Sequence, residues 1–335
     1  MRITRELLHK IARDTVKSRR RSEPDILAAY LIGSVLTDEP LLGGTTDIDL
    51  VLVHKYQAPV ERETEAVTHE ISLDIFHKRK DDFDHHRELR QDPWLGYPLT
   101  YNHILLADTD HWLEFIQAGV TAEFHRSDNV LVRVRSMLND AREGWFALNQ
   151  NAFADQAAWL QQYLSVLTSA ANAVTGLIGP PLTTRRFLLS FTEQIETLGV
   201  PKLQAGLYGL LGISKETEKK LPKWTDAFQA DFAQLSEVPG LPARLAPCRQ
   251  AYYLDAIRAM ADGGEADAAL WPLLKIWLAV RKAIPNPDKN LKVWTDSLQT
   301  LHLAEEHQTQ KTAALDAYLD TIEQVIEEWN ELYGI

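Results

Sequence analysis

Two aspartates at alternate positions of one apolar segment constrain this chain more than any other feature. Residues 47–53 (DIDLVLV) are rich in aliphatic side chains and predict a strand. Side chains alternate between the two faces of a strand, so Asp47 and Asp49 should point the same way, with Cα atoms about 7 Å apart. Two carboxylates held like this suit Mg²⁺, which prefers oxygen ligands and completes its shell with water and substrate phosphates.

Two neighbouring segments extend this pattern. Residues 29–32 (AYLI) form a short apolar run that ends at Gly33-Ser34, and twelve residues separate Ser34 from Asp47. Residues 70–76 (EISLDIF) alternate polar and apolar, which predicts a half-buried strand with Asp74 in its middle. If this strand lies beside 47–53, the three carboxylates converge. Two metal ions there could bind the attacking and leaving oxygens of an in-line phosphoryl displacement.

The order and spacing of these motifs resemble the DNA polymerase β-like nucleotidyltransferase superfamily. The resemblance implies that Gly33 and Ser34 hold a nucleoside triphosphate and that Asp47, Asp49 and Asp74 bind two Mg²⁺ ions. It covers about the first third of the chain. Residues 101–108, followed by Trp112-Leu113, resemble a further strand and turn in small-molecule members such as kanamycin nucleotidyltransferase, which have two domains.

The periodicity of apolar residues changes along the chain, which predicts two domains. The first ~115 residues follow the order helix, strand, helix, strand, strand, helix, strand, with 34–42 as a helix and loop and 78–90 as a helix. Beyond them helical periodicity dominates. The expected fold class is therefore α+β: a small mixed-sheet head over 1–118 and an all-helical domain over 119–335. The helices expected in the second domain are 128–148, 154–177, 184–198, 224–235, 247–261, 266–282 and 312–332.

Several other residues are weaker candidates. Arg185 and Arg186 stand at an expected helix start, where guanidinium groups could reach a triphosphate or an acceptor; a structural pair is the alternative. Ser34 is also a natural helix N-cap, which is compatible with binding phosphate. Glu143 is a weak candidate general base. His85-His86 lacks convergent ligand spacing, so we expect exposed histidines rather than a zinc site.

Charge and composition limit the partners. The net charge of −12 opposes a long nucleic-acid partner and tolerates a cationic acceptor. Residues 1–21 nevertheless hold eight Lys or Arg against two acidic residues, together with an apolar stripe at helical spacing. We expect an amphipathic helix packed on the head with a solvated basic face. The sequence has no run of eighteen apolar residues, so it predicts no membrane span. Its single cysteine, Cys248, favours a reducing cytoplasm.

These features together predict a Mg²⁺-dependent nucleotidyltransferase. It would move a nucleoside monophosphate from a nucleoside triphosphate, with ATP the expected donor, to an acceptor hydroxyl. A small molecule is the expected acceptor, and a protein side chain or a tRNA end is the first alternative. A non-catalytic nucleotide-binding or antitoxin-type interaction protein is the second. The acceptor's identity, the base preference and the oligomeric state stay open.

Overall fold

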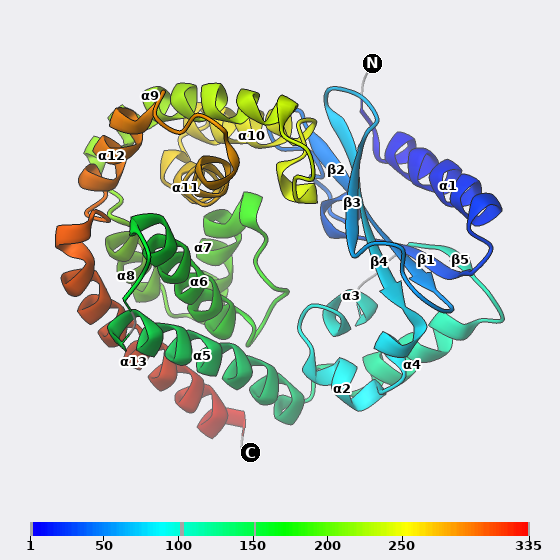
Figure 1. Ribbon diagram of the computed structural model, residues 1–335. Helices are drawn as coiled ribbons and strands as arrows, with labels where there is room; N and C mark the ends of the chain where they lie inside the picture. The colour runs from blue at the N-terminus through cyan, green and yellow to red at the C-terminus, as the bar shows by residue number, and fades with distance from the viewer. Residues whose placement is uncertain (1–2, 101–103, 151, 334–335) are drawn as a thin grey trace. The chain divides into compact units, whose positions relative to one another are not determined.

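The computed structural model describes residues 3–100, 104–150 and 152–333, and these divide into two compact units. The first unit comprises residues 1–125 and 242–256, and the second comprises 126–241 and 257–335. Each is considered by itself (Figure 1).

A five-stranded mixed sheet forms the centre of the first unit, with strand order β3-β4-β2-β1-β5. Strands β2 and β4 are parallel, and the other neighbouring pairs are antiparallel. The elements of this unit are α1 (Arg5–Ser22), β1 (Ile26–Ile32), β2 (Thr46–His54), β3 (Arg62–Ala66), β4 (Ile71–Arg79), α2 (His86–Gln91), α3 (Gly96–Thr100), β5 (Leu105–Asp108) and α4 (Trp112–Phe124).

Helix α1 covers one face of the sheet (Figure 1). Its buried residues Leu8, Ala12 and Val16 recur at helical spacing and pack against alternate residues of β2 such as Ile48 and Leu50. The other face of β2 carries Asp47 and Asp49 and then Val51 and Val53, which pack with the buried side chains of α4. Strand alternation therefore separates two chemical environments on the two faces of one sheet.

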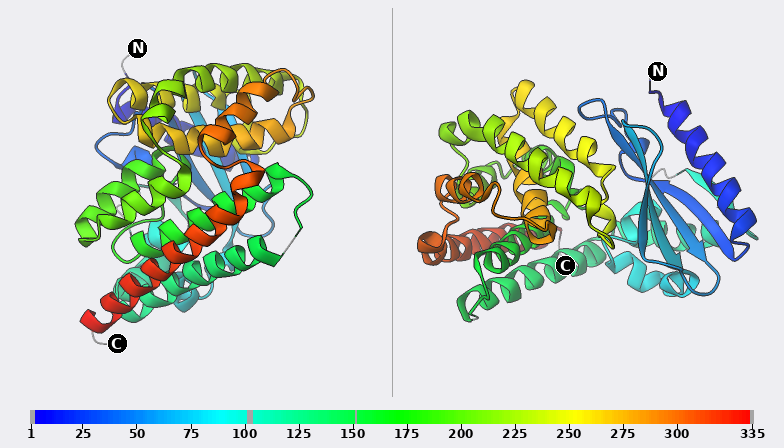
Figure 2. Two further views of the ribbon diagram at one scale, coloured as in Figure 1. Left: turned by 90° about the vertical axis from the view of Figure 1, so that its left-hand side faces the viewer. Right: turned by 45° about the horizontal axis from the view of Figure 1, so that its top comes forward.

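The second unit is helical in all the elements that the structure describes there. Its long helices α5 and α13 run side by side (Figure 2), joined by the ion pairs of Arg135 and Arg142 on α5 with acidic residues of α13. The helices are α5 (Ser127–Gln150), α6 (Gln156–Thr175), α7 (Phe187–Leu198), α8 (Lys202–Leu211), α9 (Lys215–Phe232), α11 (Ala266–Ala283), α12 (Leu291–Thr300) and α13 (Gln308–Tyr333). Helix α10 (Arg249–Asp262) begins in the first unit and ends in the second. No helix among the described residues is both long and apolar enough to cross a membrane.

The expected α+β class, a mixed sheet followed by many helices, is confirmed. The division of the chain differs from the expected one in two respects. The expected boundary between residues 118 and 119 falls inside α4, which continues to Phe124 because Val120 and Phe124 are buried in the core of the first unit. The segment 242–256, expected in the helical domain, packs with the sheet.

Local structure also departs from expectation. The helix expected after β1 is only a 3₁₀ turn, Gly33–Leu36, and the expected helix 78–90 is replaced by the end of β4, a 3₁₀ turn (Lys80–Phe83) and α2. Of the expected strand 101–108, β5 forms the last four residues, and 101–103 lie outside the described residues.

Candidate functional site

Three carboxylates meet on the face of the sheet opposite α1. Strands β2 and β4 are parallel and in register, with Asp49 opposite Asp74, and Asp47 lies two residues earlier on the same face of β2. One oxygen from each carboxylate lies within 4.8 Å of the others. Asp47 and Asp74 are buried, and Asp49 is half-buried. The structure therefore brings together the three aspartates singled out in the sequence.

Burial and charge crowding both act on the Asp49 carboxyl. Its pKa is raised well above the ordinary value, first because burial removes water and then because Asp47 and Asp74 are negatively charged. A cation placed among the three carboxylates would relieve this repulsion.

Arg62 supplies one such cation from the neighbouring strand β3. Its Nε donates to Asp74 Oδ1 at 2.7 Å, and its Nη2 donates to Asp74 Oδ2, so the contact is bidentate. The guanidinium also lies over the Phe76 ring, 4.6 Å from its centroid.

Arg249 supplies a second cation, and nothing in the sequence analysis had pointed to it. Its Nη1 lies 3.0 Å from Asp47 Oδ2, 3.3 Å from Ser72 Oγ and 3.5 Å from Asp74 Oδ2. The side chain is 3 % exposed. Its guanidinium lies over the ring of Tyr252, with Cζ 3.9 Å from the centroid.

Residues 242–256, which include Arg249, contact the rest of the first unit through their backbone carbonyl groups. Thr64 Oγ1 on β3 donates to the carbonyl of Ala243 at 3.2 Å. A Cβ on Gly43 would lie 2.1 Å from the carbonyl oxygen of Asp255, so the loop before β2 approaches this segment as only glycine can. The spacing of Arg249, Tyr252 and Tyr253 on one helical face is the sequence signal that could have revealed a buried arginine.

The turn at Gly33-Ser34 lies beside the carboxylates because Ile32 pairs with Asp49 across β1 and β2. Gly33 has φ +75°, and a Cβ there would lie 2.1 Å from Asp49 Oδ2. Ser34 Oγ is buried and has no hydrogen-bond partner among the described residues. A buried hydroxyl without a partner is costly, and a bound phosphate oxygen would satisfy it.

The close approach of Gly33 to Asp49 gives a prediction. Gly33→Ala should displace the Asp49 carboxylate and lower any activity that depends on it at least about tenfold, since a 1 Å misplacement can cost about a hundredfold. Gly44→Ala is the matched control, because Gly44 has the same φ of +75° but open space around its Cβ position. Both variants should lose about 1–2 kcal/mol of stability from the left-handed backbone. Equal activity of the two variants would contradict the steric role of Gly33.

The remaining sequence candidates belong to other elements. Arg185 and Arg186 lie in a 3₁₀ turn, Thr184–Arg186, of the second unit, where Arg185 is buried. Glu143 lies on an exposed position of α5 in the same unit. His86 packs against Phe115 in the first unit, and His85 is exposed.

The donor set fits a hard divalent cation. Three carboxylates offer only oxygen, and their arrangement suits Mg²⁺, which usually retains water or phosphate ligands. Arg62 and Arg249 now compensate two of the three negative charges. An arriving metal ion would therefore compete with these two guanidinium groups for Asp47 and Asp74.

Of the comparisons with known proteins, the one with solved structures gave a match. No protein-family model and no curated protein matches the sequence. Among solved structures, the chain is similar to a nucleotidyltransferase-like protein from Exiguobacterium sibiricum 255-15, with 9 % identity over 94 % of this chain and 91 % of the other, and a TM-score of 0.31. Because the two backbones superpose poorly at that score, the function proposed below depends on this chain's own residues.

Proposed function

We propose that this protein is a Mg²⁺-dependent nucleotidyltransferase that moves a nucleoside monophosphate from a nucleoside triphosphate, with ATP as donor, to a hydroxyl of a small molecule. The observation that carries the proposal is the convergence of Asp47, Asp49 and Asp74 beside the Gly33-Ser34 turn. Asp47, Asp49 and Asp74 would hold the magnesium ions, which when bound neutralise phosphate charge and lower the pKa of the acceptor oxygen.

The chain's own groups have separate roles in this proposal. Ser34 Oγ, which is buried and lacks a partner within the described chain, would donate to a phosphate oxygen. Arg249 and Arg62, which lie at the carboxylates, would contact the triphosphate, and Arg185 and Arg186 stay predicted contacts for a triphosphate or an acceptor. A guanidinium has five N–H donors in a planar fork, so it can contact a carboxylate and a phosphate together.

Labelled donors test the reaction class. With ATP labelled at the α-phosphate, the label should appear on the acceptor, and with ATP labelled at the γ-phosphate it should appear only in pyrophosphate. Transfer of the γ-label to an acceptor would instead identify a kinase. A chelator should stop the reaction, and Mg²⁺ should restore it.

One observation favours a second candidate, a nucleotide-binding protein without transferase activity. Arg62 and Arg249 already neutralise most of the charge of the carboxylate cluster, so the folded chain does not need a metal ion to balance that charge. Such a protein would act through a partner, as an antitoxin-type protein does. Calorimetry showing Mg²⁺-dependent triphosphate binding, without pyrophosphate release over a broad panel of acceptors, would favour this candidate.

The basic segment at the N-terminus bears on the choice of acceptor. Arg19 is paired with Glu23, Glu63 and Glu65 and is therefore structural. Four further basic side chains, Arg13, Lys17, Arg20 and Arg21, line a hollow of about 400 Å³ beside α1 and β5. This hollow lies on the α1 side of the first unit, whereas the carboxylates lie on the opposite face of the sheet. A polynucleotide bound at the hollow would lie away from the reacting groups.

We therefore expect the triple variant Arg13→Ala, Lys17→Ala, Arg21→Ala to keep its activity on a small acceptor within about twofold. All three residues are exposed on α1. If the segment instead guides RNA, the same variant should bind tRNA more weakly and reduce the slope of log affinity against log salt by about one per lost phosphate contact. Salt-sensitive tRNA binding together with transfer of α-label to tRNA would overturn the small-molecule acceptor.

A further inference from the structure

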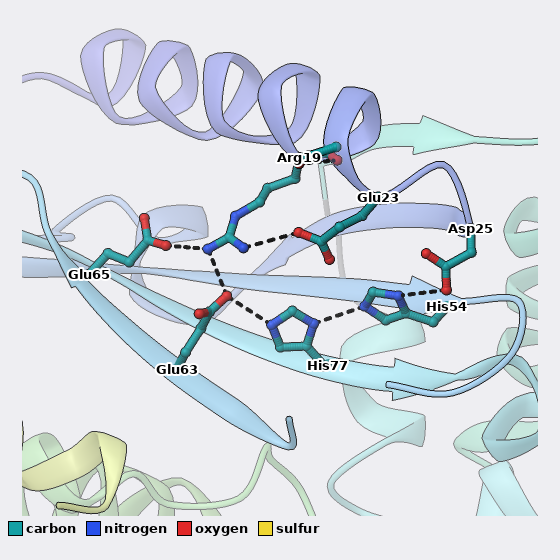
Figure 3. Close-up of polar contacts among 8 residues, drawn as sticks. Arg19, Glu23, Asp25, His54, Glu63, Glu65 and His77 are labelled. Carbon is teal, nitrogen blue, oxygen red and sulfur yellow. Dashed lines mark hydrogen bonds and ion pairs between the residues drawn. The ribbon is translucent and has the colours of Figure 1, made fainter. Parts of the chain in front are cut away.

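A second cluster of ligand-type side chains lies on the α1 face of the sheet. His54 ends β2 and His77 lies on β4, and both follow the alternation that points Leu52 and Ile75 toward α1. Both histidines are almost fully buried. Glu23 and Asp25 approach them from the turn between α1 and β1, and Glu63 approaches from β3 (Figure 3).

The outer nitrogen of each ring is held by a carboxylate. His54 Nδ1 lies 3.2 Å from Asp25 Oδ2, and His77 Nε2 lies 3.0 Å from Glu63 Oε1. An ionised carboxylate only accepts hydrogen bonds, so each of these nitrogens must carry the proton. Metal-binding histidines are commonly held by such an outer hydrogen bond, which fixes the tautomer and the ring orientation.

The inner nitrogens then face each other. His54 Nε2 and His77 Nδ1 are 2.8 Å apart, and in two neutral rings with protonated outer nitrogens both inner atoms carry lone pairs. Such a contact requires a positive species between the rings, either an additional proton or a metal ion.

One observation favours a metal ion over the proton. Glu23 offers a carboxylate oxygen within 4.8 Å of ligand atoms of both histidines, which a shared proton would not require. Oε1 of Glu23 accepts from Arg19 Nη1 at 3.1 Å, which orients the carboxylate.

We propose that Glu23, His54 and His77 form a transition-metal site that takes Zn²⁺ or a similar borderline cation. Two imidazole nitrogens and one carboxylate oxygen are ligands that Zn²⁺ accepts, with a fourth position left for water. Tetrahedral ligation at the usual Zn–N distance places the nitrogens about 3.3 Å apart, so the two rings must separate by about half an ångström. The ion would join the α1–β1 turn to β2 and β4, on the face of the sheet opposite the three aspartates.

The test uses the full chain without a histidine tag, treated with chelator and titrated in millimolar Mg²⁺ to occupy other carboxylates. Calorimetry should give one Zn²⁺ per chain, and Co²⁺ in its place should give the visible absorption of a four-coordinate site. Zinc should raise the melting temperature, because it binds the folded chain. His77→Gln should abolish the tight site, and Glu63→Gln should weaken it about tenfold or more through the lost outer hydrogen bond.

Glu65→Gln is the matched control, because Glu65 pairs with Arg19 on the same face and with neither histidine. It should leave zinc affinity within about threefold. Glu23→Gln changes a partly exposed ligand, so it reports on the site even if a histidine variant fails to fold. The proposal is overturned if the wild-type chain takes up no zinc, or if Glu23→Gln binds zinc as tightly as wild type does. A shared proton would then be the cation between the two rings.

Discussion

Pyrophosphate release by the Asp49→Asn variant is expected to fall at least about a hundredfold, because metal ions supply several kcal/mol of transition-state stabilisation and each 1.36 kcal/mol is tenfold in rate. The fold should survive. Asn has nearly the same shape, and the change removes one of three crowded negative charges around a carboxyl whose pKa is already raised. The melting temperature without metal should therefore equal or exceed that of the wild type.

Asp38→Asn is the matched control for this experiment. Asp38 is an exposed aspartate of the same unit that pairs with Arg5, so the variant should keep full activity. Wild-type rates from Asp49→Asn would contradict a catalytic role, and a collapsed melting temperature would indicate that the residue is needed for folding. Measuring both quantities on the same preparation separates these outcomes.

The second large effect concerns stability. In the presence of a chelator, Arg249→Ala should lower the free energy of unfolding by about 3–5 kcal/mol, the usual cost of removing one partner from a buried ion pair. Asp47 and Asp74, both buried, would lose this guanidinium. Millimolar Mg²⁺ should restore part of the loss, because the ion binds the carboxylates that Arg249 held, and the restoration should be larger than the effect of Mg²⁺ on wild type.

Chemical denaturation with and without Mg²⁺ measures these energies. Arg258→Ala is the control on the same helix, because Arg258 is partly exposed and contacts Gln229 and Asp226 at the surface. It should change stability by less than about 1 kcal/mol. The double variant Arg249→Ala, Asp47→Asn should be more stable than Arg249→Ala alone, since one uncompensated charge is removed. A Mg²⁺ effect no larger than that of wild type would contradict competition between Arg249 and the metal.

The sequence allowed the three aspartates to be placed because strand alternation is a strict local rule. Asp47 and Asp49 had to share a face of their strand. The alternating apolar residues around Asp74 predicted that it lies in the middle of a second strand. The sequence left the neighbour of the Asp74 strand open, since periodicity alone does not choose a neighbour, and the parallel pairing that sets Asp49 opposite Asp74 is a finding of the structure. The roles of these residues as metal ligands stay predictions.

Other parts of the fold carry weaker local signals. Strand β3 reads RETEA and has no apolar face, because Glu63 and Glu65 turn toward Arg19 while Arg62 turns toward Asp74. The first turns of α9 are highly charged and contain Pro222, so only its later part was expected. Arg249 lies 202 residues from its partner Asp47, a separation at which no sequence period connects two charges.

The return of residues 242–256 to the sheet has a consequence for the order in which the protein matures during synthesis. The ribosome completes β1 to β5 long before it reaches Arg249, and at about 5–20 residues per second the delay is on the order of ten seconds. During that interval the nascent sheet holds Asp47 and Asp74 without the arginine that later bridges them. Cellular magnesium, or simple protonation, would have to compensate the charge that Arg62 leaves unbalanced in the nascent cluster until the late segment emerges.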